Sequence, residues 1–308
     1  MAIATAQNQI SSNIFKTWLI MFLFSIFAVA VSYIFALGLG FDEASGLSLV
    51  GISFIVAGVM NFFSYYYSDK MVLAISGAKQ IQKQDHPELF RLAENLSIAS
   101  GQPMPKVYII NDSAPNAFAT GRDPKHSAVA FTTGILDKLN KPELEGVIAH
   151  ELSHIKNRDT LLMTVVSILV GLVALLADWF LRITWFGGRN RDSENKSNQI
   201  VLIIALIAAF LAPIIGTLIQ LAISRRREFL ADASGAYLTR DPEQLAYALQ
   251  KIAGDKEPLE VANRATAHLY IVNPLKGSEV VGWFANLFNT HPPIQERVKA
   301  LMAMEGKV

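Results

Sequence analysis

The chain has 308 residues, of which 52% are hydrophobic and 17% charged, with a formal net charge of +1. Soluble domains carry about 25% charged residues, so this composition favours a membrane protein. The near-neutral charge gives no indication of a nucleic-acid partner, and the absence of cysteine excludes disulfide bonds and thiolate metal ligands.

Four segments without charged residues predict membrane-spanning helices, because a helix needs about 20 apolar residues to cross a bilayer. The segments lie at residues 17–41, 44–68, 160–177 and 197–224. The first is too long for the core of a signal peptide, so we interpret it as a retained span. The third is the shortest, and Asp178 and Arg182 interrupt its far end. Pro213 and Gly216 predict a bend in the fourth.

The charges beside these segments predict how the chain lies in the membrane. Three consecutive arginines at 225–227 follow the fourth segment, whereas Asp42 and Glu43 form the link between the first two. Positive loops face the cytosol, so we expect both termini and residues 69–159 on that side. Three basic residues in the opposite loop, 183–199, argue against this orientation, although two acidic residues partly offset them.

The spans divide the chain into two membrane hairpins and two soluble parts. The hairpins are 1–68 and 160–224, and the soluble parts, which we expect to form one catalytic domain, are 69–159 and 225–308. In the first soluble part, a helix is expected from Pro87 to Gly101. Strands are expected at 106–111, 117–120 and 127–132. The fold class is therefore an α+β membrane protein, mainly helical, with four transmembrane helices and a small β-sheet.

The residues His150-Glu151-Leu152-Ser153-His154 form an H-E-x-x-H pattern just before the third segment. On a helix, both imidazoles project from one face and can bind one metal ion, typically zinc. Glu151 lies close enough to take a proton from an activated water. The alternative is a pair of surface histidines, although the apolar periodicity around the pattern predicts a partly buried helix.

A catalytic zinc usually takes three protein ligands, so the pattern needs a partner from elsewhere. The third and fourth segments form a hairpin, which returns Glu228 to the membrane face that the chain left after His154. Asp232 lies one helical turn further and is suited to orient a ligating imidazole. The alternative is that Glu228 only pairs with the arginines at 225–227.

These motifs together resemble the HtpX family of membrane-bound zinc endopeptidases, which is related to the CAAX prenyl endopeptidases. The resemblance covers nearly the whole chain. The residues that carry it are His150 to His154 with Asn157, Glu228 to Asp232, His291-Pro292-Pro293, and Arg297. It implies an inner-membrane enzyme with a zincin-like cytosolic domain and one Zn2+ per chain.

The resemblance also implies roles for individual residues. His150, His154 and Glu228 would be zinc ligands, with Glu151 as the catalytic base and Asp232 and Asn157 supporting the ligands. His291 and Arg297 would return to the cleft, near a substrate carbonyl or the developing oxyanion, although His291 could merely end a loop.

The segment that begins the second expected strand resembles the part of the family that binds substrate backbone by strand addition. The residues are Asn116, Ala117, Phe118 and Ala119. An ordinary edge strand is an equally good interpretation. His86, His126 and His268 lie outside any motif and are predicted at the surface.

The predicted function is hydrolysis of peptide bonds in misfolded or damaged membrane proteins, or in unfolded polypeptides, at the cytosolic membrane face. Three alternatives compete with it. Cleavage inside the bilayer is disfavoured by the polar run 156–159, since charges in hydrocarbon are costly. The others are a zinc-stabilised scaffold without turnover and CAAX-type processing of prenylated proteins. Nothing in the sequence indicates the oligomeric state.

Overall fold

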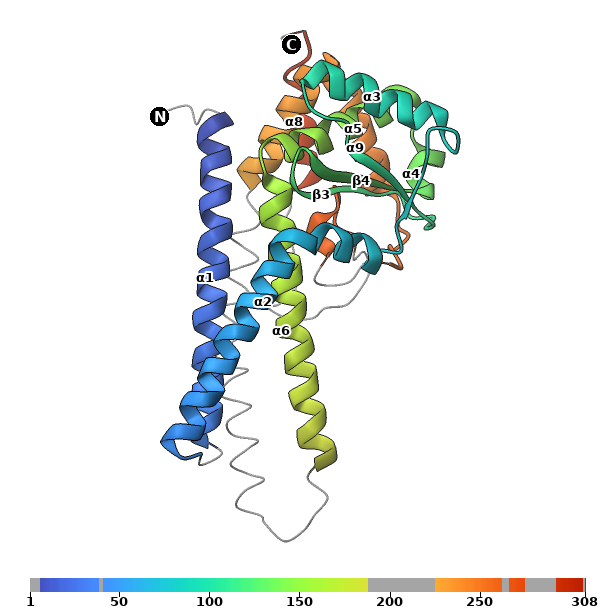
Figure 1. Cartoon of the computed structure of the whole chain (residues 1–308). Coiled ribbons are helices and arrows are strands. Elements are labelled where there is room, and N and C mark those ends of the chain that lie inside the picture. Colours follow the sequence, from blue (N-terminus) through green and yellow to red (C-terminus); the bar gives the residue numbers. More distant parts are fainter. Residues whose placement is uncertain (1–5, 39–40, 188–224, 262–265, 275–291, 307) are drawn as a thin grey trace.

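The computed structural model describes residues 6–38, 41–187, 225–261, 266–274, 292–306 and 308. Three long helices, α1 (Ala6–Gly38), α2 (Glu43–Ile75) and α6 (Asp159–Gly187), form a stalk below a mixed α and β head (Figure 1). The predicted class, a mainly helical chain with a small sheet, is confirmed. The fourth expected span lies outside the described residues.

The first two expected spans are helices whose apolar side chains face outwards. Stretches within α1 and α2 have mean hydropathies of 2.2 and 1.9, and only 22% and 17% of their most apolar windows are buried. A core helix of a soluble protein would be mostly buried, so this exposure fits helices that lie in lipid. Phe54 and Ile55, for example, are 63% and 66% exposed.

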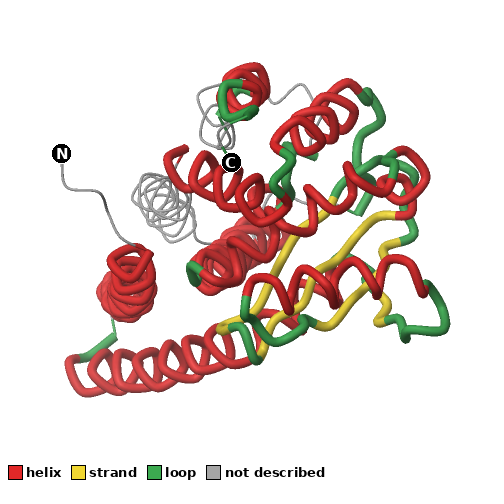
Figure 2. Tube along the Cα trace, turned by 90° about the horizontal axis from the view of Figure 1, so that it is seen from above, coloured by secondary structure: helices red, strands yellow, loops and turns green. Residues whose placement is uncertain are grey.

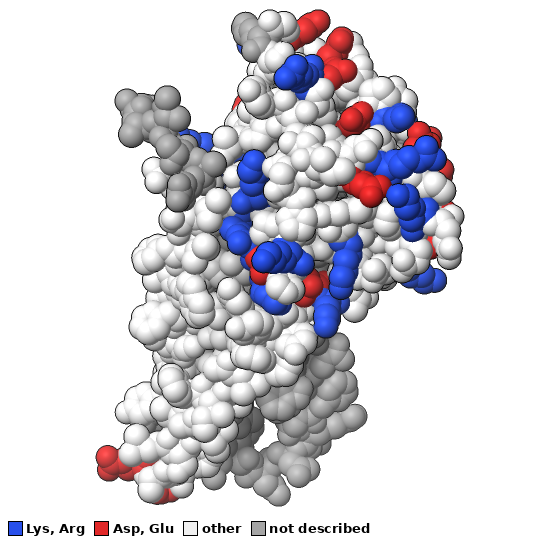
Figure 3. Space-filling view, turned by 45° about the horizontal axis from the view of Figure 1, so that its top comes forward, with Lys and Arg blue, Asp and Glu red and all other residues white. Residues whose placement is uncertain are grey.

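Charged side chains are distributed as this interpretation requires. Figure 3 shows them over the head and at the far tip of the stalk, with a surface between that is nearly free of them. Asp42, which caps α2, and Glu43 lie in the link between the two stalk helices. Because charges are excluded from hydrocarbon, the uncharged band is the part of this surface that suits a bilayer.

The first half of α6, which begins the third expected span, lies inside the protein. Its side chains from Thr160 to Val170 are buried, in part against α1 and α2. Three of them are polar and bind the head: Thr160 Oγ1 donates to Gly121 O at 2.9 Å, Thr164 Oγ1 lies 3.1 Å from Thr120 Oγ1, and Ser167 contacts His268. The apolar side chains of this half of α6 therefore contact other parts of the protein. The third membrane crossing stays a prediction.

The head contains a four-stranded sheet in the order β1-β2-β4-β3, in which only β2 and β4 are parallel. The strands are β1 (Lys79–Gln80), β2 (Lys106–Ile110), β3 (Ala117–Asp123) and β4 (His126–Thr132). The three expected strands are confirmed, and the two-residue β1 was not foreseen because it is too short to show a pattern. β3 lies at an edge of the sheet.

Helices cover both faces of this sheet (Figure 2). One face packs against α3 (Pro87–Ser100), α5 (Lys141–Lys156) and α9 (Pro242–Gly254). The other packs against the end of α2, the start of α6 and a short 3-10 helix, η1 (Ala267–Leu269). The remaining head helices are α4 (Thr133–Lys138), α8 (Arg225–Thr239) and α11 (Ile294–Met302).

The ends of α3 and the exposure of the histidines outside the motif are both predicted from the sequence. Gly101 ends α3 with a φ of +70°, and His86 caps it by accepting a hydrogen bond from Leu89 N. The surface prediction is confirmed for His126 and wrong for His268, which is only 3% exposed. His268 Nε2 lies 3.1 Å from Ser167 Oγ, a partner about a hundred residues away that spacing alone does not reveal.

Candidate metal centre

Helix α5 places the H-E-x-x-H residues at the centre of the head. Asn140 caps the start of α5. Its side-chain oxygen accepts a hydrogen bond from Glu143 N at 3.0 Å, and the Glu143 carboxylate accepts one from Asn140 N at 2.9 Å. His150, Glu151 and His154 are 1%, 2% and 5% exposed. The alternative of a surface histidine pair is therefore excluded.

Helix α8 brings the third candidate ligand to the same place. Glu228 in its first turn is 3% exposed, and the three donor atoms of His150, His154 and Glu228 lie within 4.8 Å of one another. Gly235 allows this close approach, because a Cβ there would lie 3.0 Å from the backbone nitrogen of His150. Asp232 lies on the same face of α8, one turn after Glu228.

The distances between the donor atoms suit a tetrahedral cation. The two Nε2 atoms are 3.1 Å apart, and Glu228 oxygens lie 3.8 Å from His150 Nε2 and 3.6 Å from His154 Nε2. Ligands on a tetrahedral zinc with bonds of about 2.0–2.1 Å are roughly 3.3 Å from one another. In the part of the chain that the structure describes, this is the one such cluster.

Buried carboxylates hold both imidazoles from behind. Asp232 Oδ1 lies 3.0 Å from His150 Nδ1, and Asp159 Oδ2 lies 3.0 Å from His154 Nδ1. A proton held on each Nδ1 leaves the Nε2 lone pairs facing each other and the Glu228 carboxylate. These lone pairs and the carboxylate repel one another unless a positive charge lies between them, so the donor set fits a metal ion.

Asp159 is the supporting residue that sequence reasoning missed. It begins α6, is 0% exposed, and also forms an ion pair with Arg227 at 2.9 Å. The sequence contained a signal, because an acidic residue five positions after a candidate ligand starts an uncharged helix. By sequence alone, Asp159 is only the last residue of the polar run 156–159.

Arg297 lies behind the ligands and braces α8. It is 0% exposed, and its Nε and Nη2 donate to the two oxygens of Asp232 at 2.7 and 2.6 Å. Its Nη1 donates to Ile271 O at 3.0 Å and lies 3.5 Å from Glu228. Arg297 thus lies at the site as expected, with its closest polar contacts to this carboxylate and carbonyl. Its expected contact with a substrate carbonyl or oxyanion stays a prediction.

The electrostatics of the cluster favour added positive charge. Burial by itself lowers the pKa of His154, but the Asp159 and Glu228 carboxylates outweigh it and raise that pKa to about 9. The pKa of His150 falls because of burial and the neighbouring His154. Without a metal, His154 therefore carries a second proton, on Nε2, which faces Nε2 of His150 at 3.1 Å in the place that a cation would take.

Glu151 occupies a different environment from the three candidate ligands. Burial raises its pKa to about 7, and the backbone N–H of Ala119 and the nearby His154 act in the opposite direction. A bound cation would lower this pKa further by direct attraction. A carboxyl group with a pKa near neutrality is suited to accept and release a proton.

The segment predicted to bind substrate forms the start of β3, and its first residues are already paired. Asn116 Nδ2 donates to Val272 O, and Ala117 O accepts from Ile271 N, both at 3.0 Å. Phe118 packs edge-on against a buried tyrosine of the same covering segment, and Ala119 faces Glu151. Strand addition at this edge stays a prediction.

Two further predicted residues have different outcomes. Asn157 ends α5 and is 5% exposed, and its backbone N–H donates to Ser153 O at 3.1 Å. Its carbonyl accepts a hydrogen bond from Asn13 of α1. His291 lies outside the described residues. The supporting role of Asn157 and the catalytic role of His291 stay predictions.

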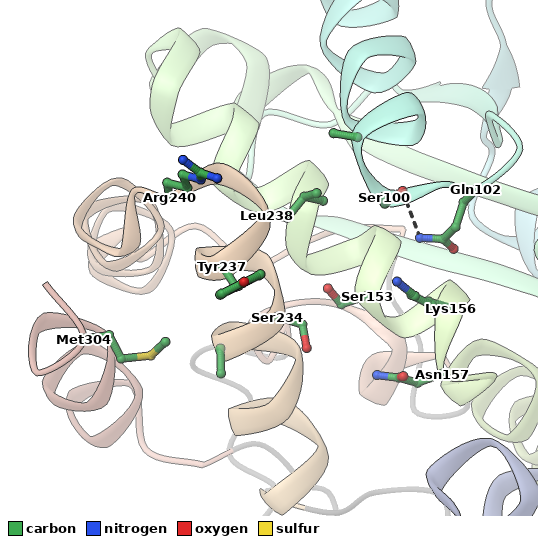
Figure 4. A pocket seen from close by; sticks show the side chains of 12 residues that line it. Ser100, Gln102, Ser153, Lys156, Asn157, Ser234, Tyr237, Leu238, Arg240 and Met304 are labelled. Atoms are coloured by element: carbon green, nitrogen blue, oxygen red, sulfur yellow. Dashed lines mark hydrogen bonds between the residues drawn. The ribbon is translucent and has the colours of Figure 1, made fainter. Parts of the chain in front are cut away.

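A cavity of about 770 Å³ lies beside the centre, between α5 and α8 (Figure 4). Ser153, Lys156 and Asn157 of α5 line it, together with Ser234 and Tyr237 of α8. None of the three candidate ligands lines it. The cavity is therefore not the direct approach to the cluster.

The chain is similar to several known proteins. The family model for peptidase family M48 matches residues 83–305. The chain is 44% identical over 300 residues to the protease HtpX homolog of Dictyoglomus thermophilum, covering 97% of this chain and 95% of the relative. It is 48% identical over 258 residues to that of Pyrococcus furiosus, covering 82% and 86%. The crystal structure of S. mikatae Ste24p is 19% identical with a TM-score of 0.48, covering 92% of this chain and 62% of that chain.

Proposed function

This chain belongs to peptidase family M48, and we propose that His150, His154 and Glu228 form its zinc site, with Glu151 as the general base. Its relatives make it a membrane-bound metallopeptidase. The observation that carries the residue assignment is the convergence of three buried donor atoms on one point. The two imidazoles are already oriented there by carboxylates.

The donor set of two imidazoles and one carboxylate is one that catalytic zinc uses. Zinc, when bound, supplies a Lewis acid that acidifies water and polarises a peptide carbonyl. Asp232 and Asp159 hold the ligand imidazoles with Nδ1 protonated, so that Nε2 stays free for the ion. Arg297 keeps Asp232 ionised and in place through two hydrogen bonds.

Glu151 performs the proton transfers of the hydrolysis. Its carboxylate accepts a proton from the attacking water and then delivers that proton to the nitrogen of the leaving amine. Its burial excludes competing bulk water. Burial raises the pKa of its carboxyl group, and a bound cation would lower that pKa and favour the carboxylate that accepts the proton.

The active site is assigned to the cytosolic side of a bacterial inner membrane. Basic residues gather where the stalk meets the head, including Lys70 of α2, Arg122 of β3 and Arg225 of α8, while the acidic link Asp42–Glu43 lies at the far end of α2. This polarity follows the positive-inside rule. We assign two further crossings to 160–177 and 197–224, so that 69–159 and 225–308 form one zincin-like catalytic domain between the hairpins 1–68 and 160–224.

The substrates assigned to this site are polypeptides, including damaged or misfolded membrane proteins that reach the cytosolic membrane surface. An extended backbone would lie along β3 near Ala119, whose N–H points to Glu151, beyond the part of the edge that Ile271 covers. Processing of prenylated proteins would use the same chemistry on a narrower substrate class. Cleavage of an unfolded test protein without a lipid group would separate the two.

The test uses the full chain purified in detergent and assayed for metal content and for cleavage of an unfolded protein. We expect about one zinc per chain, loss of cleavage with a chelator, and recovery on adding zinc. A chain that binds zinc but cleaves nothing under these conditions would instead be a zinc-stabilised scaffold. Cleavage unaffected by complete metal removal would overturn the proposal.

A further inference from the structure

A buried asparagine on the first stalk helix connects the membrane part to the metal centre. Asn13 of α1 is 0% exposed, whereas Asn8 and Ser11, other polar residues in the first turns of the same helix, are exposed. Burying an amide costs free energy unless its polar atoms are hydrogen-bonded. A residue of this kind therefore reflects a specific contact.

The contact is with the end of the metal helix and the start of α6. Asn13 Nδ2 donates to the backbone oxygen of Asn157 at 2.9 Å and to Asp159 Oδ1 at 2.6 Å. The opposite orientation of the amide would place its oxygen against a carbonyl and a carboxylate, which is repulsive. The donated bonds therefore define how Asn13 is seated.

Asp159 passes this contact to the cluster. While its Oδ1 accepts from Asn13, its Oδ2 lies 3.0 Å from Nδ1 of His154. Asn13 of α1 thus orients the Asp159 carboxylate, and this carboxylate orients the imidazole of His154. Arg227, directly before Glu228, pairs with Oδ1 as well, so α1, α5, α6 and α8 meet at this one carboxylate.

Apolar packing already attaches α1 to the stalk without Asn13. Ile20, Met21 and Phe24 pack with Leu162, Val165 and Leu169 of α6 in a separate apolar cluster. The Asn13 contact lies beyond that cluster, at the level of the metal helix, and it is polar. The Asn13 contact is therefore better suited to orient Asp159 than to attach α1 to the rest of the protein.

We propose that Asn13 is a positioning residue of the metal centre, through which the seating of α1 on the head controls how tightly the metal is held. The proposal rests on the proposed function, because it takes His154 as a ligand. Partners that orient ligands typically change metal affinity by about 10–100-fold when removed. Asn13 acts through Asp159, so we expect an effect near the lower end, about tenfold.

The test compares Asn13→Leu with a matched change in the same helix pair. Asn61 of α2 is also buried and donates two hydrogen bonds, to Met21 O at 3.0 Å and Ser25 Oγ at 2.8 Å, without any contact to the metal helix. Zinc affinity of the full-length protein in detergent is measured by competition with a chromophoric chelator. The visible spectrum of the cobalt-loaded protein reports ligand geometry without an activity assay.

We expect Asn13→Leu to weaken zinc binding by about tenfold and to alter the cobalt spectrum, while Asn61→Leu changes neither. Asn13→Gln, which keeps the donor group, should recover part of the affinity. If Asn13→Leu does not fold, Asn13→Ala removes the same donor without adding bulk and replaces it in the comparison.

Two results would overturn the inference alone. One is unchanged affinity in Asn13→Leu, and the other is an equal loss in Asn61→Leu, which would show that only helix packing matters. A wild-type chain that binds no zinc gives a distinct result, since it would overturn the proposed function and the inference with it.

Discussion

Each imidazole of the metal centre is oriented by a carboxylate from a different helix, Asp232 from α8 and Asp159 from α6. With Glu151 and Glu228, four buried carboxylates face two buried guanidinium groups, those of Arg227 and Arg297. If all are ionised and the histidines are neutral, the cluster carries a net charge of −2. Uncompensated buried charge is costly, so a divalent cation is the counterion that this cluster suits.

Replacing Glu151 by Gln tests the base without removing a ligand. We expect loss of peptide cleavage by about 100-fold to 10,000-fold, the usual contribution of a general base, because the amide cannot accept the proton of water. Zinc content, measured by atomic absorption, should stay near that of the wild type. Glu145→Gln, on a less buried position of the same helix, should leave cleavage unchanged. Full activity of Glu151→Gln would remove Glu151 from the mechanism.

Replacing Asp159 by Asn tests the residue that the sequence analysis missed. The amide is nearly isosteric, but it removes the charge that stabilises a proton on His154 Nδ1. Zinc affinity should fall by about 10–100-fold, measured by chelator competition. Asp137→Asn, at an exposed position of α4, serves as the control. Equal affinities in the two variants would mean that Asp159 only caps or packs α6.

Most of the centre could be predicted at the residue scale because its residues follow short rules. His150 and His154 are spaced for one helix face with Glu151 beside them, and Glu228 is expected from the predicted return of the chain through a second hairpin. Asp159 and Arg297 depend on which side chains meet in space. Spacing does not distinguish Asp159 from a solvated charge. Only the family resemblance indicates that Arg297 lies near the site, and it does not show that Arg297 binds Asp232.

At the scale of elements, the site depends on how closely α8 approaches α5. Glu228, Asp232 and Gly235 lie on one face of α8, and the glycine meets the backbone of the metal helix at His150. A Cβ at Gly235 would lie closer to the backbone of α5 than an ordinary van der Waals contact allows, so α8 or α5 would have to move. Glu228 would move with it.

Gly235→Ala should therefore weaken zinc binding more than it weakens the fold. Alanine favours a helix by about 1 kcal/mol over glycine, which offsets part of the overpacking cost of about 1–3 kcal/mol. The displacement of Glu228 has no such compensation, and we expect about a tenfold loss of affinity in the chelator assay. Gly254→Ala, where an added Cβ meets nothing within 4 Å, is the matched control. Unchanged affinity in Gly235→Ala would show that the interface yields without moving the ligand.

For the molecule as a whole, α6 shows what a charge-free stretch does not reveal. Such a stretch predicts a membrane-spanning helix, and the structure adds that the first half of α6 is enclosed by the sheet, α1 and α2. Thr164 and Ser167 provide the visible difference, since their hydroxyls meet Thr120 and His268. Burial in lipid and burial in protein select the same apolar residues, so hydropathy alone does not separate them.

Contacts of the metal centre join the stalk helices to the head, so metal binding should stabilise the whole folded chain. The proposed ligands come from α5 and α8, and Asp159 links them to α6 and α1. A ligand at about 1,000 times its Kd stabilises the folded state by about 4 kcal/mol. We expect a chelator to lower the Tm of the full chain in detergent by several degrees, followed by intrinsic fluorescence. In Glu228→Gln, which lacks a proposed ligand, the same chelator should shift the Tm far less. An equal shift in both proteins would show that the chelator acts elsewhere, and that the cluster does not hold the metal that stabilises the fold.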